Sequence, residues 1–300
     1  MKVAQSCRLC GATSLLVSYD GPMRHSGVGK DLCNVFRILR CECCNVEFID
    51  PFSEESQDVY KNGSYWNRKG GRSNVDIDLL HSKALEENLL WLEKIGTANL
   101  AGKCVLDFGC GSGAFLDLIK GVAGATIGIE RDGVLAAYAR KRGHLVFCSI
   151  EELLAAGIKT DILVSFDVFE HLTEPLTVLE SLKNAFVSGG LLYVGVPNQL
   201  DKIKALVPAY LPHFYHVEHK WYFDAHSMRH LFEQAGCHID ALRYLHKYNF
   251  MNLIEWARTG KAPGNPHCGA VDDDLDNRIR GWLEDRGAAS HLLLETSFAQ

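Results

Sequence analysis

The stretch "VLDFGCGSGAFL", residues 105–116, decides the fold of this chain. It opens with apolar residues typical of a buried strand and closes with the start of a helix, and Gly109, Gly111 and Gly113 lie between them. Glycines allow left-handed dihedrals and let a ligand approach the main chain closely. The N-terminus of the following helix offers unpaired N–H groups. The pattern therefore predicts a strand–turn–helix unit that binds a small molecule.

Two carboxylates accompany this turn. Asp107 directly precedes the glycines, where it can meet a positively charged or hydroxylated ligand, and Glu130 ends the next apolar run. A carboxylate at that second position can accept hydrogen bonds from both hydroxyls of a ribose. The dinucleotide fingerprint G-x-G-x-x-G is not matched, because its third glycine would fall on Ala114. A nicotinamide site and a turn that serves only packing remain alternatives.

Strand-like and helix-like segments alternate from residue 103 onwards. The strand-like runs are 103–109, 125–130, 145–149, 161–166, 189–197 and 238–245, and the helical segments are 114–122, 133–143, 151–157, 175–186 and 224–236. Such alternation predicts an α/β fold with a doubly wound, mainly parallel sheet covered by helices on both faces. Ligands bind such sheets at the carboxyl ends of the strands, near the switch in strand order.

Five motifs in order resemble the class I S-adenosylmethionine-dependent methyltransferases: "LDFGCGSGAFL", "GIE", "FCSIEEL", "DILVSFDVFEHL" and "GGLLYVGVPN". The resemblance covers roughly residues 100–245 and implies a Rossmann-like sheet of seven strands with S-adenosyl-L-methionine as cofactor. It places the glycines against the amino-acid part of the cofactor, and Glu130 on the ribose. The residues that it assigns to the cofactor are Asp107, Gly109, Gly111, Glu130, Ser149, Ile150, Phe166 and Asp167. A loop with Tyr60, Tyr65 and Trp66 is expected to cover the methionine end.

Cysteines are concentrated near the N-terminus. Cys7 and Cys10, and then Cys41 and Cys44, form two C-x2-C pairs. Each pair has the spacing at which a tight turn brings two thiolates to one tetrahedral metal ion, and the glycine and asparagine after the pairs suit such turns. We predict a structural Zn²⁺ here, with Cys43 as a spectator; buried or reactive free thiols are the alternative.

Charge and hydropathy argue against nucleic-acid and membrane partners. The net charge is −6 and there is no long basic block, which argues against a nucleic-acid surface. No apolar run approaches the roughly 18 residues that span a bilayer, and the first residues lack the apolar segment of a secretory signal. We therefore expect a cytoplasmic protein that binds neither nucleic acid nor membrane. Its oligomeric state is left open.

The domain prediction follows from these features. Residues 1–50 form a zinc-binding knuckle, 51–100 a cap loop and helix, and 101–300 the methyltransferase domain, with acceptor-site insertions at 199–224 and 247–290. The combination resembles bacterial methyltransferases of sugar and cell-surface polysaccharide pathways. Zinc-bearing sugar C-methyltransferases share the cysteine pairs but have a further C-terminal domain, so the resemblance favours transfer to a hydroxyl.

The acceptor side offers several candidate bases. His171 lies on the turn after the fourth strand, and His216 and His219 lie in the aromatic loop 213–223. The stretch "DVFEH" also resembles the acidic motif of the ubiquinone-pathway O-methyltransferases, which implies a Mg²⁺ site at Asp167, Glu170 and His171. The alternative to the Mg²⁺ site is that Glu170 and His171 only orient the loop. The alternative for residues 213–223 is an aromatic lid that only packs on the core.

Together these features predict a methyltransferase that acts on a hydroxyl of a sugar or other small molecule, with His171 as the leading base. The alternatives are C-methylation of a nucleotide-linked keto-sugar and a non-catalytic module that keeps the cofactor site.

Overall fold

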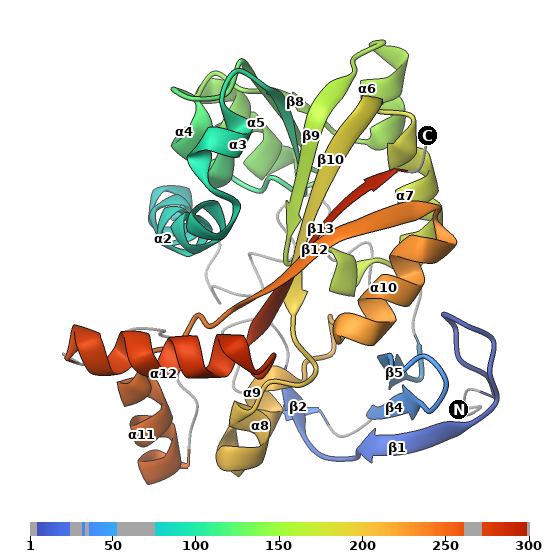
Figure 1. Ribbon diagram of the computed structural model, residues 1–300, viewed down its shortest axis with the longest axis vertical. Coiled ribbons are helices and arrows are strands. Elements are labelled where there is room, and N and C mark those ends of the chain that lie inside the picture. The colour runs from blue at the N-terminus through green and yellow to red at the C-terminus, as the bar shows by residue number, and fades with distance from the viewer. Residues whose placement is uncertain (1–4, 25–31, 34–35, 53–75, 261–271, 299–300) are drawn as a thin grey trace.

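A computed structural model describes residues 5–24, 32–33, 36–52, 76–260 and 272–298 (Figure 1). Its centre is a seven-stranded sheet in which β13 runs antiparallel to both neighbours and the other strands run parallel to one another. The predicted doubly wound, mainly parallel sheet is confirmed. The strands in spatial order are β12 (Cys237–Leu245), β13 (His291–Phe298), β10 (Phe186–Pro197), β9 (Thr160–Phe166), β6 (Cys104–Phe108), β7 (Ala125–Ile129) and β8 (Leu145–Phe147).

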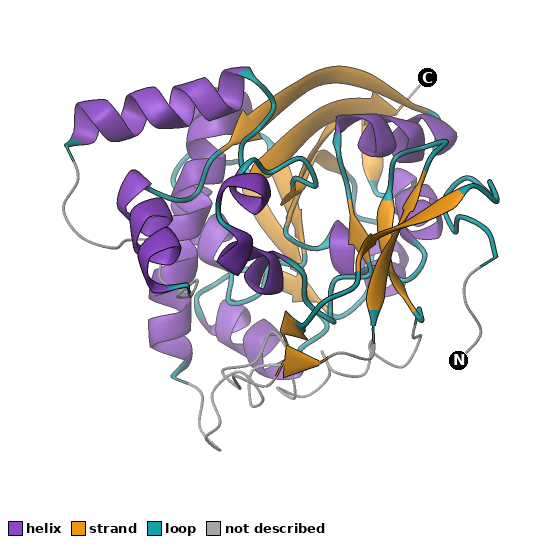
Figure 2. Ribbon diagram, turned by 90° about the horizontal axis from the view of Figure 1, so that it is seen from below, coloured by secondary structure: helices purple, strands orange, loops and turns teal. Residues whose placement is uncertain are grey.

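Helices cover both faces of this sheet (Figure 2). Successive side chains of a strand point to opposite faces, so Val105 of β6 joins one apolar cluster and Leu106 joins the other. The Val105 cluster includes residues of α2 (Ile77–Ile95), α3 (Thr97–Leu100) and α4 (Ala114–Ile119). The Leu106 cluster includes residues of α6 (Ile150–Ala155), α7 (Pro175–Lys183) and α10 (Ala225–Gln234). The helix α5 (Gly133–Lys141) packs on α4 and β8.

The helix α2 is buried on a narrower face than its leucine spacing predicts. Its buried side chains are His81, Trp91, Leu92 and Ile95. Leu79 and Leu89 fit the helical period but are 54% and 44% exposed. Trp91 determines how the helix packs on the sheet. Its ring lies so close to Gly195 of β10 that it would collide with any side chain at that position. No helix in the described ranges is long and apolar enough to cross a bilayer.

The N-terminal residues form a second sheet of four antiparallel strands, in the order β1 (Leu15–Tyr19), β4 (Arg37–Cys41), β5 (Glu47–Asp50) and β11 (Trp221–Tyr222). The last strand comes from the predicted acceptor-site insertion, and Trp221 pairs with Phe48. The Nδ2 atom of Asn45 also donates to the Asp224 carboxylate at the start of α10, at 3.0 Å. The cysteine-rich unit is therefore joined to the rest of the protein by a shared sheet.

The insertions after β10 and β12 are mainly helical. Residues 199–224 include α8 (Ile203–Leu206), η3 (Pro208–Tyr210) and α9 (Leu211–Phe214), and these pack around β2 (Met23–Arg24). Residues 247–290 include α11 (Phe250–Thr259) and α12 (Asp273–Asp285). A short helix, η2 (Phe169–His171), follows β9, and a two-residue strand, β3 (Leu32–Cys33), pairs with β2.

Candidate functional site

The glycine turn after β6 has the backbone that its sequence predicts. Gly109, Gly111 and Gly113 have φ values of 85°, 54° and 80°. A Cβ atom on Gly109 would lie 2.4 Å from a methyl carbon of Val168, so the turn packs directly against the residue before η2. The N–H groups of Gly109 and Cys110 donate to the Ile129 carbonyl, which joins the turn to β7. The turn therefore lies beside the end of β9 at the switch in strand order.

Of the two predicted cofactor carboxyls at this edge, Asp107 is buried and Glu130 is half-buried. The Glu130 side chain accepts from the N–H groups of Gly111 at 2.8 Å and Asp132 at 2.7 Å, which fixes it against the turn. Burial raises the pKa of Glu130. Burial and the nearby Glu130 charge raise the pKa of Asp107 to about 8. A cation or hydroxyl donor placed beside Asp107 and Glu130 would stabilise their charged forms.

The other predicted cofactor residues lie at the ends of β8 and β9. Ser149 accepts from the Glu152 N–H and caps α6, while Ile150 packs on the core beside it. Phe166 stacks on Trp91, with ring centroids 5.0 Å apart. Tyr65, with the rest of the predicted cap loop, lies outside the described residues.

Asp167 has an unusual backbone and a partner that the sequence analysis missed. Its φ is 55°, which is uncommon for a residue other than glycine and costs free energy. Its carboxylate lies 2.6 Å from Nζ of Lys247 and 3.5 Å from Nε2 of His291. Burial would lower the pKa of Lys247, but the Asp167 charge outweighs it and raises that pKa. Lys247 follows β12 in the sequence, and only the pairing of β12 with β13 brings it to the end of β9.

Replacing Lys247 by Met should leave the Asp167 carboxylate without its cation. We expect the free energy of unfolding to fall by about 2 kcal/mol, less than for a fully buried pair, because the Asp167 side chain is 34% exposed. The double variant Lys247→Met/Asp167→Asn should recover most of that loss in chemical denaturation. A double variant no more stable than Lys247→Met would contradict the pairing.

The predicted base candidates from two separate segments meet in one histidine cluster, formed by His171, His216 and His219. The ring centroids of His171 and His219 are 4.6 Å apart, and those of His216 and His219 are 3.4 Å apart. The Nδ1 atom of His171 lies 3.0 Å from the Glu218 carbonyl oxygen. Since a carbonyl only accepts, this Nδ1 carries the proton and Nε2 is the basic nitrogen.

Glu170 lies between two of these rings. One of its oxygens is 3.9 Å from Nε2 of His171 and 3.8 Å from Nε2 of His219. The residue is 1% exposed, and within the described ranges neither carboxyl oxygen has a hydrogen-bond partner, nor does Nδ1 of His219. Burial and the Asp167 charge raise the pKa of Glu170, while burial lowers the pKa of His171 to about 4. Burial therefore favours the protonated form of the Glu170 carboxyl and keeps the His171 imidazole neutral near neutral pH.

The residues do not fit the predicted Mg²⁺ site. The carboxylate of Asp167 lies on Lys247, and the ligand atoms that converge within 4.8 Å belong to Glu170, His171 and His219. Two of these three donors are imidazole nitrogens, whereas Mg²⁺ prefers an octahedral set of oxygens. The predicted second carboxylate is missing because the Asp167 side chain is directed to Lys247 and His291.

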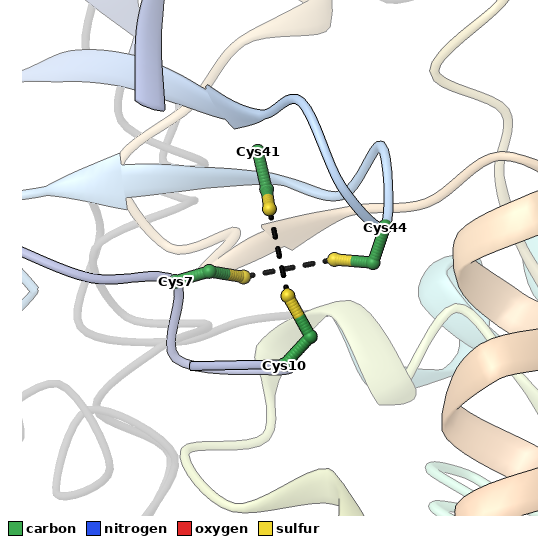
Figure 3. Close-up of side chains that lie close together, drawn as sticks. All are labelled: Cys7, Cys10, Cys41 and Cys44. Carbon is green, nitrogen blue, oxygen red and sulfur yellow. Dashed lines mark hydrogen bonds between the residues drawn. The ribbon is translucent and has the colours of Figure 1, made fainter. Parts of the chain in front are cut away.

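The four predicted zinc ligands converge (Figure 3). The Sγ atoms of Cys7 and Cys44 are 3.6 Å apart, those of Cys10 and Cys41 are 3.5 Å apart, and all four lie within 4.8 Å of one another. With Zn–S bonds of about 2.3 Å, the sulfurs of a tetrahedral site are separated by about 3.8 Å.

The backbone around the cysteines also has the predicted form. Gly11 and Asn45 have φ values of 77° and 65°. Their N–H groups donate to the carbonyls of Cys7 and Cys41, which closes the two turns. The donor set and its spacing therefore fit Zn²⁺.

Comparison with known proteins agrees with this geometry. A family model described as a methyltransferase domain matches residues 79–242, more than half of the chain. The crystal structure of an S-adenosylmethionine-dependent methyltransferase from Archaeoglobus fulgidus has the same fold, with a TM-score of 0.50 and 16% identity over 74% of this chain and 99% of that one.

Curated relatives match a shorter region. A ubiquinone biosynthesis O-methyltransferase from Glaesserella parasuis is 30% identical over 37% of this chain and 52% of its own length. A tRNA U34 carboxymethyltransferase from Sodalis glossinidius is 38% identical over 37% of this chain and 38% of its own length. The chain thus spans about half or less of these relatives. Because the family model covers the glycine turn, Asp107, Glu130 and the histidine cluster, the chain belongs to the methyltransferase-domain family and has the fold of the S-adenosylmethionine-dependent enzymes.

Proposed function

We propose that this protein transfers the methyl group of S-adenosylmethionine to a hydroxyl of a small-molecule acceptor, with sugars as the preferred class. The observation that carries the proposal is the histidine cluster with Glu170. Buried polar atoms without partners are rare and mark places where a ligand or water completes the hydrogen bonds. Here the two Glu170 oxygens, which have no hydrogen-bond partner among the described residues, lie on the turn that follows β9, three residues after Asp167, and Val168 of that turn contacts the glycine turn at Gly109.

S-adenosylmethionine supplies an electrophilic methyl group when it is bound. The residues of the chain hold the acceptor hydroxyl in line with it and take up the proton that the hydroxyl loses. The neutral Nε2 of His171 is the proton acceptor, held in its tautomer by the Glu218 carbonyl. His219 and His216 are the neighbours that orient the hydroxyl or share its proton. Glu170, protonated and buried, adds no negative charge that would hinder the approach of the acceptor.

Oxygen as the methylated atom is supported by the name of the relative from Glaesserella parasuis, an O-methyltransferase. The preference for a sugar rests on the resemblance of the cysteine pairs and core to polysaccharide methyltransferases. Neither a nucleic-acid nor a membrane partner is part of the proposal, because the net charge is −6 and basic residues form no long block.

C-methylation of a keto-sugar is the second candidate, and one observation favours it. Enolisation beside a carbonyl needs a base for the C–H proton and an acid for the carbonyl oxygen. The basic Nε2 of His171 and the protonated Glu170 lie 3.9 Å apart and form such a pair. Solvent deuterium incorporation into a keto-sugar, in the presence of S-adenosylhomocysteine, would favour C-methylation. Methylated hydroxyls in product analysis would favour O-methylation.

We also propose that Cys7, Cys10, Cys41 and Cys44 hold Zn²⁺. Four thiolates close the coordination sphere, so the metal would be structural and take no part in methyl transfer.

Replacing His171 by Gln should lower kcat by about 100-fold or more, because the proton acceptor is lost. The affinity for S-adenosylhomocysteine should stay within about twofold, since the ring does not belong to the glycine turn. An assay of S-adenosylhomocysteine release with a panel of hydroxylated sugars measures the first quantity, and calorimetry measures the second. His226→Gln, an exposed position on α10, is the control. An equal loss of turnover and cofactor affinity would show that His171 only shapes the site.

The pH dependence should be unusual for a histidine base. The lowered pKa of His171, about 4, keeps its imidazole neutral well below the ordinary pH range for histidine. We therefore expect kcat/KM to stay level as the pH falls from 8 to about 5 and to decline only below that value. The profile is to be measured where circular dichroism shows folded protein. A decline centred near pH 6.5 would exclude His171 as the base.

A further inference from the structure

We infer that the acceptor carries an anionic group, a phosphate or a carboxylate, and that Arg24 binds it. This inference rests on the proposed function and specifies the acceptor of that same site. Its evidence is a cation beside the histidine cluster that has no anionic partner among the residues that the structure describes.

The position of Arg24 is fixed by its backbone. Its N–H donates to the Tyr215 carbonyl at 3.4 Å, and its carbonyl accepts from the Val217 N–H at 3.1 Å. These two bonds form a parallel bridge between Arg24 and His216. The N-terminal segment thereby contributes an arginine to the insertion that carries His216 and His219.

The Arg24 guanidinium is poorly compensated where it lies. Its Nε atom is buried and has no hydrogen-bond partner in the described part of the chain. Among the residues that the structure describes, no carboxylate lies within 4.0 Å of it. Two lysines of the insertions, by contrast, have carboxylate partners: Lys247 lies 2.6 Å from Asp167, and Lys204 lies 3.9 Å from Glu47. An unpaired buried donor on a charged group costs free energy that a bound anion would recover.

The charge of Arg24 acts on the acceptor side of the molecule. It adds to burial in lowering the pKa of His213 and of His219, and it also influences Tyr222 and Tyr248. Tyr248 adjoins Lys247, whose ammonium lies on Asp167 at the end of β9. The Arg24 charge therefore reaches residues of both insertions, and the backbone bridge places Arg24 beside His216.

The chemistry of the guanidinium specifies the ligand. Its planar set of N–H donors matches two oxygens of a phosphate or carboxylate, and one such pair fixes orientation as well as position. An anionic substituent held by Arg24 would place a neighbouring hydroxyl against the histidine cluster. The acceptor class is accordingly a sugar phosphate, a sugar linked to a phosphate chain, or a sugar acid.

The test is anion binding to the protein saturated with S-adenosylhomocysteine. Calorimetry with inorganic phosphate, pyrophosphate and acetate distinguishes a phosphate site from a carboxylate site. At least one anion should bind, and Arg24→Gln should weaken it by about tenfold or more, while Arg24→Lys should weaken it less because it keeps the charge. Arg278→Gln is the matched control, since that side chain is 77% exposed on α12. No binding to the wild type, or equal binding to Arg24→Gln, would overturn the inference.

Should Arg24→Gln fail to fold, the wild type still decides the question. A bound anion would neutralise the charge of Arg24. The ring resonances of His213 and His219 should therefore shift in nuclear magnetic resonance spectra of the wild type when the anion is added. Unchanged rings at saturating anion would refute the site. Cofactor binding without anion binding would leave the proposed methyl transfer intact, whereas anion binding without methylation of any acceptor would count against the proposed function alone.

Discussion

Gly109→Ala should abolish measurable binding of S-adenosylmethionine. The φ of this residue is 85°, a region that alanine adopts only with strain, and the added Cβ would lie 2.4 Å from a methyl carbon of Val168. The side chain of valine is branched at Cβ and cannot rotate away easily. The turn or η2 must therefore move, and both border the cofactor. We expect the affinity for S-adenosylhomocysteine to fall by about 100-fold or more in calorimetry.

Two variants separate the possible causes of that loss. Gly189→Ala has a comparable φ of 75° with nothing within 4 Å of the new Cβ, so it should show backbone strain without loss of cofactor affinity. Adding Val168→Ala to Gly109→Ala should restore part of the affinity by removing the collision. Normal cofactor affinity in Gly109→Ala would mean that the turn does not hold the ligand.

The fold could be predicted from local patterns because each is decided within a few residues. Alternating apolar segments determined the sheet, and the glycines after residue 108 determined the turn. Gly11 and Asn45 identified the two cysteine turns, since each has a positive φ that the donor spacing requires. In all three cases the physical cause lies within one element or one loop.

The parts that escaped prediction depend on contacts between distant segments. Lys247 reaches Asp167 because β12 and β13 are neighbours, and no local pattern indicates that pair. Arg24 is beside His216 because β2 lies against the insertion after β10. The meeting of His171 with His219 has the same origin. Asp167 was assigned to a metal by motif, but its side-chain direction depends on its positive φ and on Lys247.

Loss of zinc should disable methyl transfer while leaving the cofactor site usable. The reason is the sheet that the cysteine unit shares with the core. The turn at Cys41–Cys44 connects β4 to β5, and β5 pairs with β11 through Phe48 and Trp221. The Ile49 N–H also donates to the Lys220 carbonyl at 3.1 Å, next to His219. The hydroxyl of Tyr222 on β11 bonds both the N–H and the carbonyl of His216.

Cys44→Ser should therefore lower the zinc content from about one ion per chain and reduce the melting temperature. Zinc-finger peptides gain roughly 10–16 kcal/mol from their metal, so the cysteine turns should not persist without it. With β5 displaced, His216 and His219 lose their support and turnover should fall by about tenfold or more. The glycine turn, which follows β6 and is held by hydrogen bonds to Ile129 of β7, should keep its affinity for S-adenosylhomocysteine within about threefold.

Cys43→Ser is the matched control for this experiment. Cys43 lies in the same turn but is exposed, and it is not among the four sulfurs that converge. Metal analysis, thermal unfolding and turnover of this variant should equal those of the wild type. If Cys44→Ser lost its zinc and still methylated acceptors at the normal rate, the histidine cluster would not depend on the cysteine unit. The shared strand β11 would then have to be held by the core alone, through the bond from Trp221 Nε1 to the Leu172 carbonyl at 2.7 Å.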